Sequence, residues 1–132
     1  MSRPLAMSAL GALMIAALIA GVMLFSASPA ANAQTVTVHK TPWCGCCAAW
    51  VDHLHDEGFY VIVKEEGDLT PIRSRLGVRD ELMSCHTAEV DGYVVEGHVP
   101  AREIRRLLEE KPDVNGVSVP GMPQGSPGME TP

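Results

Sequence analysis

Residues 35–50 read TVTVHKTPWCGCCAAW, and this stretch decides the fold. Its first residues are β-branched and alternating, which predicts a strand over residues 35–40. A Thr-Pro turn follows, and apolar residues then recur at helical spacing, which predicts a helix over about residues 46–57. A C-x-x-C pattern, from Cys44 to Cys47, therefore stands where a strand turns into a helix.

The rest of the chain extends this unit into a βαβ-α-ββ-α order. Hydrophobic patterns and an Asp-Gly hairpin turn predict strands at residues 59–64, 87–90 and 93–96. Helix-capping residues predict helices at residues 70–77 and 100–111. This order is typical of an α/β fold of the thioredoxin-like kind, with one mixed four-stranded sheet and helices packed on it. Residues 116–132 are rich in Gly, Pro and Met, so an irregular C-terminal tail is expected.

That fold brings three distant segments together at one rim of the sheet. If the third strand runs antiparallel to the first, its start lies beside the end of the first strand, and the fourth strand ends at the same edge. The segments are the loops at residues 44–47, 84–86 and 97–100. All four cysteines, together with His86 and His98, are therefore expected at this rim.

The N-terminus has the features of an export signal. Arg3 precedes an uncharged apolar run over residues 5–25, and Ala31-Asn32-Ala33 has the small-x-small pattern that a signal peptidase accepts. Cleavage after Ala33 is expected; the alternative is an uncleaved membrane anchor, since about 20 apolar residues can span a bilayer. A periplasmic location is expected, and the predicted parts are a signal (1–33), a thioredoxin-like metal-binding domain (34–115) and a tail (116–132).

The charge of the chain argues against one class of partner. Sixteen acidic residues against ten basic ones give a net charge of −6. Binding to nucleic acid relies on clustered Lys and Arg that contact phosphates. No nucleic acid is therefore expected as a partner, and a membrane is expected only if the signal stays uncleaved.

The four cysteines are compatible with redox, metal-binding and structural roles. A C-x-x-C pair at a helix N-terminus favours thiolate, so Cys44 could attack and Cys47 resolve in a thiol-disulfide oxidoreductase. Cys46 or Cys85 would then supply a second disulfide. Thiolates also select soft metals such as Cu(I) and Zn(II), and a third thiol in the loop serves a metal site more than an oxidoreductase. The same thiols also suit a structural zinc site of Cys46, Cys47, Cys85 and a histidine, or purely structural disulfides.

Cys46 joins such a site on one condition. In a regular helix it would point about 200° round from Cys44, at 100° per residue. The loop must therefore still be non-helical at Cys46, which Gly45 would permit.

The motifs resemble those of the CopG-type periplasmic copper-resistance proteins, a thioredoxin-like family long described as a domain of unknown function. The matching segments are TPWCGCCAAWV at 41–51, SCHT at 84–87, GYVVEGHVP at 92–100 and GMPQGSPGME at 121–130. This resemblance implies that copper is bound in the periplasm by Cys44, Cys46, Cys47 and Cys85. It also implies a role in copper resistance and homeostasis, with redox handling of Cu(I) and Cu(II). Composition and spacing by themselves indicate only a thiol-rich rim.

Four further side chains are candidate ligands. His86 and His98 adjoin the cysteines, although either could instead orient a loop by hydrogen bonds. The thioethers of Met122 and Met129 are soft donors in a tail that either docks or is disordered. Docking near the thiols is expected, with Met122 as the closer contact.

The leading hypothesis is an exported Cu(I)-binding protein, with copper ions and other periplasmic copper-handling proteins as its partners. The first alternative is a thiol-disulfide oxidoreductase that uses Cys44 and Cys47, and the second is a structural zinc domain. As an enzyme, the chain would be a thiol-disulfide or copper oxidoreductase. Trp43 and Trp50 are expected to shield the thiol loop and to fill the core.

Overall fold

The computed structural model describes residues 33–130 of the chain. The predicted signal, up to residue 32, and the last two residues lie outside this described part. Within residues 33–130, no helix is both long enough and apolar enough to cross a membrane.

The structure consists of a mixed sheet with helices. The strands are β1 (Thr35–Lys40), β2 (Tyr60–Glu65), β3 (His86–Val90), β4 (Tyr93–Glu96) and β5 (Gly116–Ser118). The helices are α2 (Gly45–Asp56), α3 (Thr70–Leu76) and α4 (Ala101–Glu110), with a short 3-10 helix at Asp80–Leu82. The sheet order is β2-β1-β3-β4-β5. β1 is parallel to β2 and antiparallel to β3, and β4 is antiparallel to β3 and parallel to β5.

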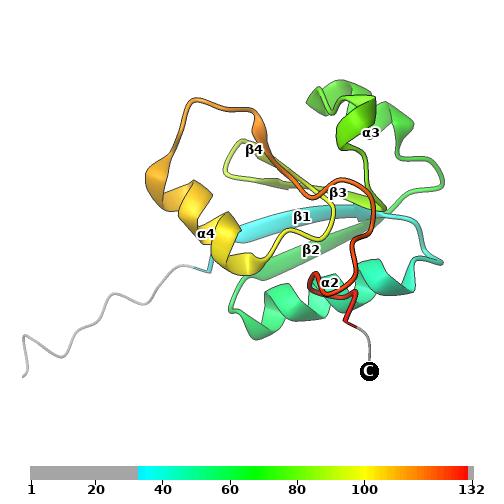
Figure 1. The fold of residues 1–132 in the computed structure, drawn as a ribbon, viewed down its shortest axis with the longest axis horizontal. Coiled ribbons are helices and arrows are strands. Elements are labelled where there is room, and N and C mark those ends of the chain that lie inside the picture. The colour runs from blue at the N-terminus through cyan, green and yellow to red at the C-terminus, as the bar shows by residue number, and fades with distance from the viewer. Residues whose placement is uncertain (1–32, 131–132) are drawn as a thin grey trace, which may run out of the picture. The chain divides into compact units, whose positions relative to one another are not determined.

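The predicted α/β order is confirmed, and helices α2 and α4 cover the core. Their buried residues recur at helical spacing: Cys47, Trp50, Val51 and Leu54 in α2, and Ala101, Ile104 and Leu107 in α4. Val36 and Val38 of β1 belong to the same buried cluster. Figure 1 shows α2 and α4 near each other and α3 apart from them. Because α3 buries none of its residues, it contributes little to this core.

β5 lies in the segment that the sequence predicts to be irregular, so both the four-stranded sheet and the wholly irregular tail are wrong. Its residues pair in parallel with β4, and Val117 lies opposite Val95. Three residues are too few to show the alternation that identifies a strand, so only the free edge of β4 reveals it. The approach is close: a Cβ at Gly116 would lie 1.8 Å from the carbonyl oxygen of Val94.

Candidate metal centre

Four cysteines from two distant segments meet at one end of the sheet. Because β3 runs antiparallel to β1, with Lys40 opposite His86, Cys85 lies next to the loop that leaves β1. The Cys46 Sγ lies 3.9 Å from the Cys85 Sγ and 3.5 Å from the Cys44 Sγ. The four sulfurs all lie within 4.8 Å of one another. The fold thus brings together the cysteines that the element order places at one rim.

The cluster contains one disulfide. The Cys44 and Cys47 sulfurs are bonded, whereas Cys46 and Cys85 are free thiols. The structure therefore describes a form oxidised at the C-x-x-C pair, with one of the two disulfides that four cysteines could form. Reduction of this disulfide takes two electrons and two protons and leaves four thiols in one cluster.

The backbone conformation that brings Cys46 to the cluster differs from the predicted one. Helix α2 begins at Gly45, so Cys46 is already helical and the expected non-helical loop at this residue is wrong. The helical angle between residues 44 and 46 does not apply, because Cys44 is the N-cap and has an extended backbone (φ −81°, ψ 97°). The extended cap lets the two sulfurs approach each other although one of them lies in the helix.

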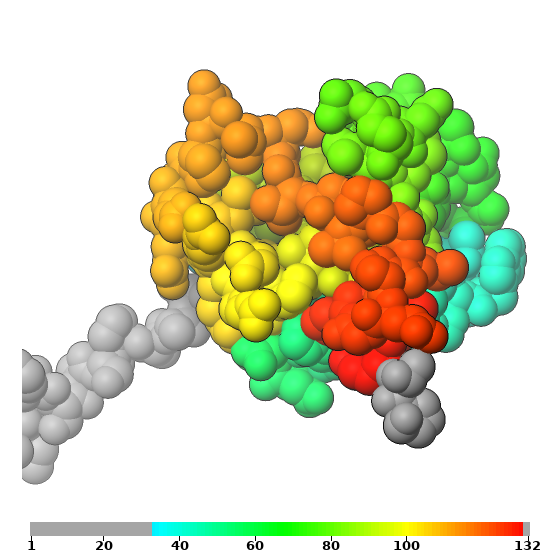
Figure 2. All heavy atoms as spheres, viewed as in Figure 1, coloured from blue at the N-terminus to red at the C-terminus, as the bar shows by residue number. Residues whose placement is uncertain are grey.

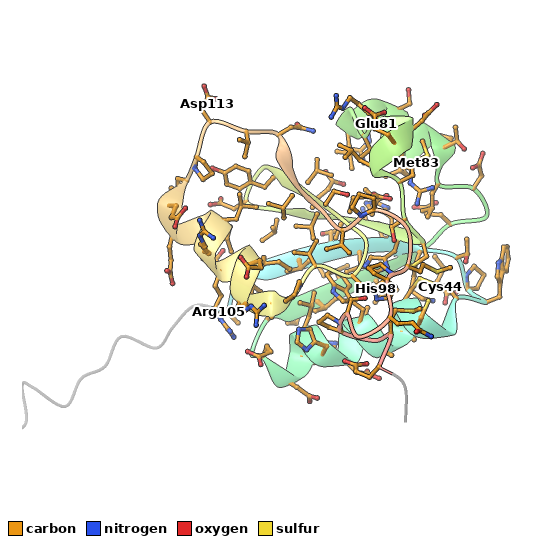
Figure 3. All side chains as sticks on the ribbon, viewed as in Figure 1. Cys44, Glu81, Met83, His98, Arg105 and Asp113 are labelled. Atoms are coloured by element: carbon orange, nitrogen blue, oxygen red, sulfur yellow. A yellow bond between two sulfur atoms is a disulfide. The ribbon has the colours of Figure 1, made fainter. Side chains whose placement is uncertain are left out.

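His98 presents a ring nitrogen to Cys85. Its Nε2 lies 2.9 Å from the Cys85 Sγ, and its Nδ1 lies 2.8 Å from the carbonyl oxygen of Pro127 in the tail. A carbonyl oxygen only accepts hydrogen bonds, so Nδ1 carries the proton of the neutral ring and Nε2 keeps its lone pair. The tail thereby holds His98 in the tautomer that can accept from a thiol or ligate a metal. Figure 3 shows His98 and Cys44 on the same side of the molecule.

His86 is fully buried beside Cys85, with its Nδ1 3.3 Å from the Cys85 Sγ. Its ring centroid lies 4.3 Å from that of Trp50 and 4.9 Å from that of His98. Burial, with a smaller contribution from His98, lowers the pKa of His86 to about 3, so the ring is neutral at neutral pH. Among the described residues, nothing hydrogen-bonds to its buried Nε2. A neutral buried imidazole with an unpaired nitrogen is a suitable soft-metal ligand.

Cys85 belongs to two groups of candidate ligands. It completes the set of four cysteines, and with His86 and His98 it forms a second set whose ligand atoms lie within 4.8 Å of one another. Burial raises the pKa of the Cys85 thiol to about 11, and the neighbouring Cys46 adds to the shift. The thiol is therefore protonated at neutral pH in this form, and a metal ion binding there must displace its proton.

A buried ion pair that sequence reasoning missed holds the segment before Cys85. The Glu96 carboxylate pairs with Arg73 Nη2 at 3.1 Å and accepts the Ser84 amide at 2.7 Å and the Thr87 hydroxyl at 2.6 Å. Arg73 also donates to the Ser84 carbonyl oxygen at 2.5 Å. Both backbone groups of Ser84 are thus fixed by one ion pair. These partners lie 11 and 12 positions from Ser84, so no local pattern in the sequence marks them.

The tail docks against the cysteine segments, as predicted. The Gly121 amide donates to the Met83 carbonyl oxygen at 2.9 Å, and the Ser84 hydroxyl donates to the Gly121 carbonyl oxygen. Gly128 packs on the first turn of α2, where a Cβ would lie 2.8 Å from the Cys46 carbonyl oxygen. Met122, expected as the closer thioether, is 56% exposed. Met129 is partly buried and adjoins Gly128, so both ends of the segment 121–129 are docked and Met129 is the less exposed of the two thioethers.

A Gly128→Ala change is expected to release the end of the tail. The added Cβ would lie 2.8 Å from the Cys46 carbonyl oxygen and from the Trp50 amide nitrogen, and backbone atoms cannot move aside as a side chain does. Such overpacking typically costs about 1–3 kcal/mol, which corresponds to a rise of about 5- to 150-fold in the undocked population. Limited proteolysis of the tail and the rate of Cys46 and Cys85 alkylation measure the effect.

Gly125→Ala is the matched control for this change. Gly125 has a φ of +83°, close to the +80° of Gly128, so both substitutions carry the same backbone strain. A Cβ at residue 125 meets nothing within 4 Å. Equal rates of proteolysis and alkylation in the two variants would contradict a docking role for Gly128.

Two histidines outside the cluster have structural partners. His39 places Nδ1 3.1 Å from Glu66 and Nε2 3.0 Å from Glu89. His53 Nε2 accepts the Ala101 amide at 3.1 Å, at the start of α4. Both rings are therefore engaged away from the thiols.

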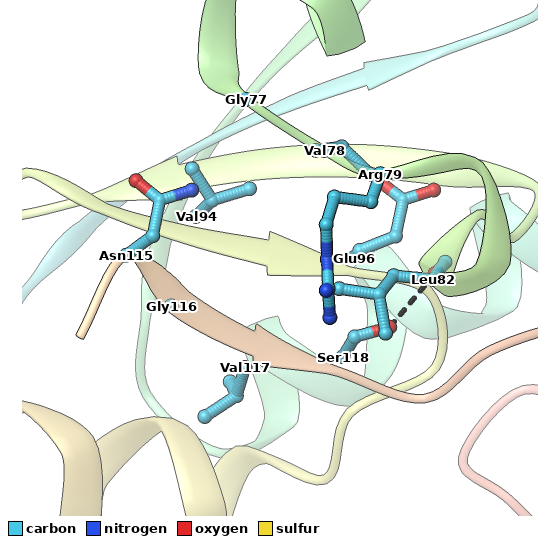
Figure 4. A pocket seen from close by; sticks show the side chains of 10 residues that line it. All are labelled: Gly77, Val78, Arg79, Leu82, Val94, Glu96, Asn115, Gly116, Val117 and Ser118. Atoms are coloured by element: carbon cyan, nitrogen blue, oxygen red, sulfur yellow. Dashed lines mark hydrogen bonds between the residues drawn. The ribbon is translucent and has the colours of Figure 1, made fainter.

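A groove of about 590 Å³ lies between the segment that follows α3 and strands β4 and β5 (Figure 4). Its polar side chains already have partners within the fold: Asn115 donates to the Leu76 carbonyl oxygen, and Ser118 donates to the Leu82 carbonyl oxygen. The residues that line it include no cysteine or histidine. The four cysteines lie together elsewhere, with His86 and His98 beside Cys85.

Comparison with known proteins gives a family and two solved structures. A family model described as a protein of unknown function, DUF411, matches residues 82–129. A structure of copper resistance protein CopG, form 2, is 48% identical with a TM-score of 0.73, and the match covers 76% of this chain and 80% of that one. Form 1 of that protein is also 48% identical, with a TM-score of 0.72 and coverage of 76% and 79%. No curated protein matches the chain.

Proposed function

This chain belongs to the family of the copper resistance protein CopG, and on that premise we propose that it binds copper as Cu(I) on its four-cysteine cluster and serves copper resistance in the periplasm. The observation that carries the proposal is the approach of the four sulfurs to within 4.8 Å of one another. Sulfur donors at such spacing suit a soft cation, because thiolates select Cu(I) over harder ions.

The two ligand groups support a site with room for more than one copper ion. Cys85 belongs to both, so its sulfur can bridge an ion held by the other cysteines and an ion held with His86 and His98. The His98 Nε2 lone pair and the neutral His86 ring suit this second position. The buried Nε2 of His86, which lacks a partner among the described residues, is consistent with a ring that acts as a ligand when metal is present.

The proposed site depends on the redox state of the chain. Cys44 and Cys47 are bonded to each other in the described form, so their sulfurs become thiolate ligands only after reduction. We expect protein reduced and kept without oxygen to bind at least twice as much Cu(I) as protein with the disulfide intact, because the number of free thiols rises from two to four. Metal analysis after gel filtration, with a competing Cu(I) chelator, measures the difference.

Three results of that measurement would count against the proposal. Equal copper binding by oxidised and reduced protein would remove Cys44 and Cys47 from the site. Stable zinc after growth with added copper would favour a structural zinc domain. Copper bound only as Cu(II) would contradict the thiolate cluster, because thiolate ligands favour Cu(I).

A thiol-disulfide oxidoreductase is the second candidate function, and one observation favours it. The Cys44–Cys47 disulfide stands at the N-terminus of α2, and the free Cys46 thiol lies 3.5 Å from the Cys44 sulfur. Turnover with a disulfide substrate that needs only Cys44 and Cys47, together with full copper binding by Cys46→Ser, would place this function first.

Export is a separate part of the proposal. Cleavage after Ala33 would leave Gln34 as the first residue of the isolated protein. N-terminal sequencing of protein from the periplasmic fraction checks this directly. Residues 1–33 retained on a membrane-bound chain would favour the anchor instead.

A further inference from the structure

Trp43 stands exposed beside the cluster, contrary to the expectation that it shields the thiols. It is 75% exposed, whereas Trp50 is fully buried as predicted. Trp43 directly precedes Cys44, so a large aromatic surface lies in solvent next to a disulfide sulfur. A tryptophan this exposed has no packing role within the described chain. Tryptophan is also one of the residue types enriched among those that dominate the energy of protein interfaces.

The turn that carries Trp43 is held rigidly. The Cys44 amide donates to the Thr41 carbonyl oxygen at 3.2 Å, which closes a turn over Pro42 and Trp43. Proline fixes one backbone angle of that turn, and the Ala48 amide ties its end to α2 by donating to the Cys44 carbonyl oxygen at 3.3 Å. An aromatic side chain on a rigid turn loses little conformational freedom when a partner covers it.

Four segments without charged residues meet around the thiols, and the Glu130 carboxylate and the Arg73–Glu96 pair adjoin them. The segments that meet there are residues 41–51, 83–86, 97–101 and 116–129, and none of them contains Asp, Glu, Lys or Arg. The charged residues that give the chain its net charge of −6 lie outside these four segments in the sequence. We call these four segments the uncharged collar. Figure 2 shows the loop after β1 (cyan) beside the tail (orange to red) on one face of the molecule.

We propose that the uncharged collar is the docking face for a protein that exchanges Cu(I) through its own sulfur ligands, with Trp43 as the anchor. This inference rests on the proposed function, since it assumes that the cysteines hold copper. Direct ligand exchange requires a sulfur of the partner to bond the same metal ion, so the surfaces around both sites must come into contact. Met122, 56% exposed, follows Gly121, which is bonded to Ser84 beside the cluster, so the tail adds a second apolar group to the face.

The charge pattern determines what kind of partner fits. A charged group brought against the uncharged collar would lose its water without gaining an ion partner, which is unfavourable. The fitting partner therefore surrounds its sulfur ligands with an apolar or neutral surface. A free copper chelator needs no such surface, so loading from a chelator and exchange with a protein depend on Trp43 differently.

The test separates copper binding from copper exchange. Cells that lack their own copy of the gene receive the wild-type chain, Trp43→Ala, Trp43→Phe or Val114→Ala, and the copper concentration that halves growth is measured. Val114 is 50% exposed and lies outside the collar, which makes it the matched control. In parallel, the isolated reduced proteins are titrated with Cu(I) against a chelator.

We expect Trp43→Ala to bind Cu(I) within twofold of the wild type yet to leave cells as copper-sensitive as those without the gene. Truncation of a central tryptophan commonly weakens a protein complex by roughly thirtyfold or more. Trp43→Phe should restore much of the tolerance because it keeps an aromatic anchor, and Val114→Ala should restore all of it.

Each contrary outcome has a definite meaning. Full tolerance with Trp43→Ala and intact copper binding would overturn the docking face while leaving the proposed function in place. Loss of Cu(I) binding in Trp43→Ala would show that the residue supports the metal site instead. A copper-loaded dimer that Trp43→Ala dissociates, detected by sedimentation, would identify a second copy of this chain as the occupant and overturn the proposed partner. No effect of the gene on copper tolerance would overturn the proposed function and this inference with it.

Discussion

Replacement of Cys85 by serine is expected to weaken Cu(I) binding by reduced protein by more than about a hundredfold. Loss of a hydrogen-bonding partner of a metal ligand typically costs about 10- to 100-fold in affinity, and Cys85 is a candidate ligand itself. Its sulfur belongs to both ligand groups, so its loss affects the four-cysteine set and the set with His86 and His98 together. Titration against a Cu(I) chelator without oxygen measures the affinity and the number of ions bound.

Other serine variants distinguish a copper cluster from a thiol-disulfide oxidoreductase. Cys46→Ser should lower Cu(I) binding as much as Cys44→Ser does, because a copper cluster uses every thiol whereas an oxidoreductase needs only its C-x-x-C pair. Ala48→Ser, on the exposed side of the same helix, introduces the same hydroxyl without removing a sulfur and should leave binding unchanged. Full copper binding by both Cys46→Ser and Cys85→Ser would exclude the four-cysteine site.

Arg73→Met is expected to cost the protein about 3–5 kcal/mol of free energy of unfolding, because it leaves a buried carboxylate without its ion partner. The Glu96 side chain is 2% exposed and lies 3.1 Å from the Arg73 guanidinium. The same change removes the donor to the Ser84 carbonyl oxygen and should loosen the segment that positions Cys85. Urea unfolding measures the stability, and the alkylation rate of the Cys85 thiol measures the loosening.

Arg75→Met, in the same helix α3, is the matched control. Its side chain is 54% exposed and pairs with Glu89, and exposed pairs contribute only about 0–1 kcal/mol. Arg73→Lys keeps the positive charge without the planar fork, so its effect should lie between those of the wild type and Arg73→Met. If the two methionine variants lose the same stability and alkylate at the same rate, Arg73 does not hold the Cys85 segment.

The sequence predicts much of the fold because its signals are local. Asp91 and Gly92 both adopt positive φ, 47° and 85°, as the hairpin turn between β3 and β4 requires. The stripe from Cys47 to Leu54 identifies α2 through its own spacing. β5 could not be predicted from the sequence, because it forms only by pairing with the free edge of β4, which lies more than twenty positions away in the chain.

The sequence likewise predicts one part of the candidate site and not the other. The element order and the two strand directions suffice to bring Cys85 to the Cys44–Cys47 loop, so the gathering of the thiols follows from the sequence. The orientation of each candidate ligand does not follow from the sequence, because it depends on contacts between segments that no local pattern links.

The amino-acid sequence alone determined which residues are candidates for the site: the cysteine spacing, the His-bearing loops and the uncharged segments are all read from the chain. The tertiary structure alone decided how they are held. The Pro127 carbonyl sets the tautomer of His98 across 29 positions, and Arg73 fixes Ser84 across 11. The physical reason is that residue types and short-range periodicity are properties of neighbours in the chain, whereas hydrogen-bond partners, burial and the resulting pKa shifts are properties of neighbours in space.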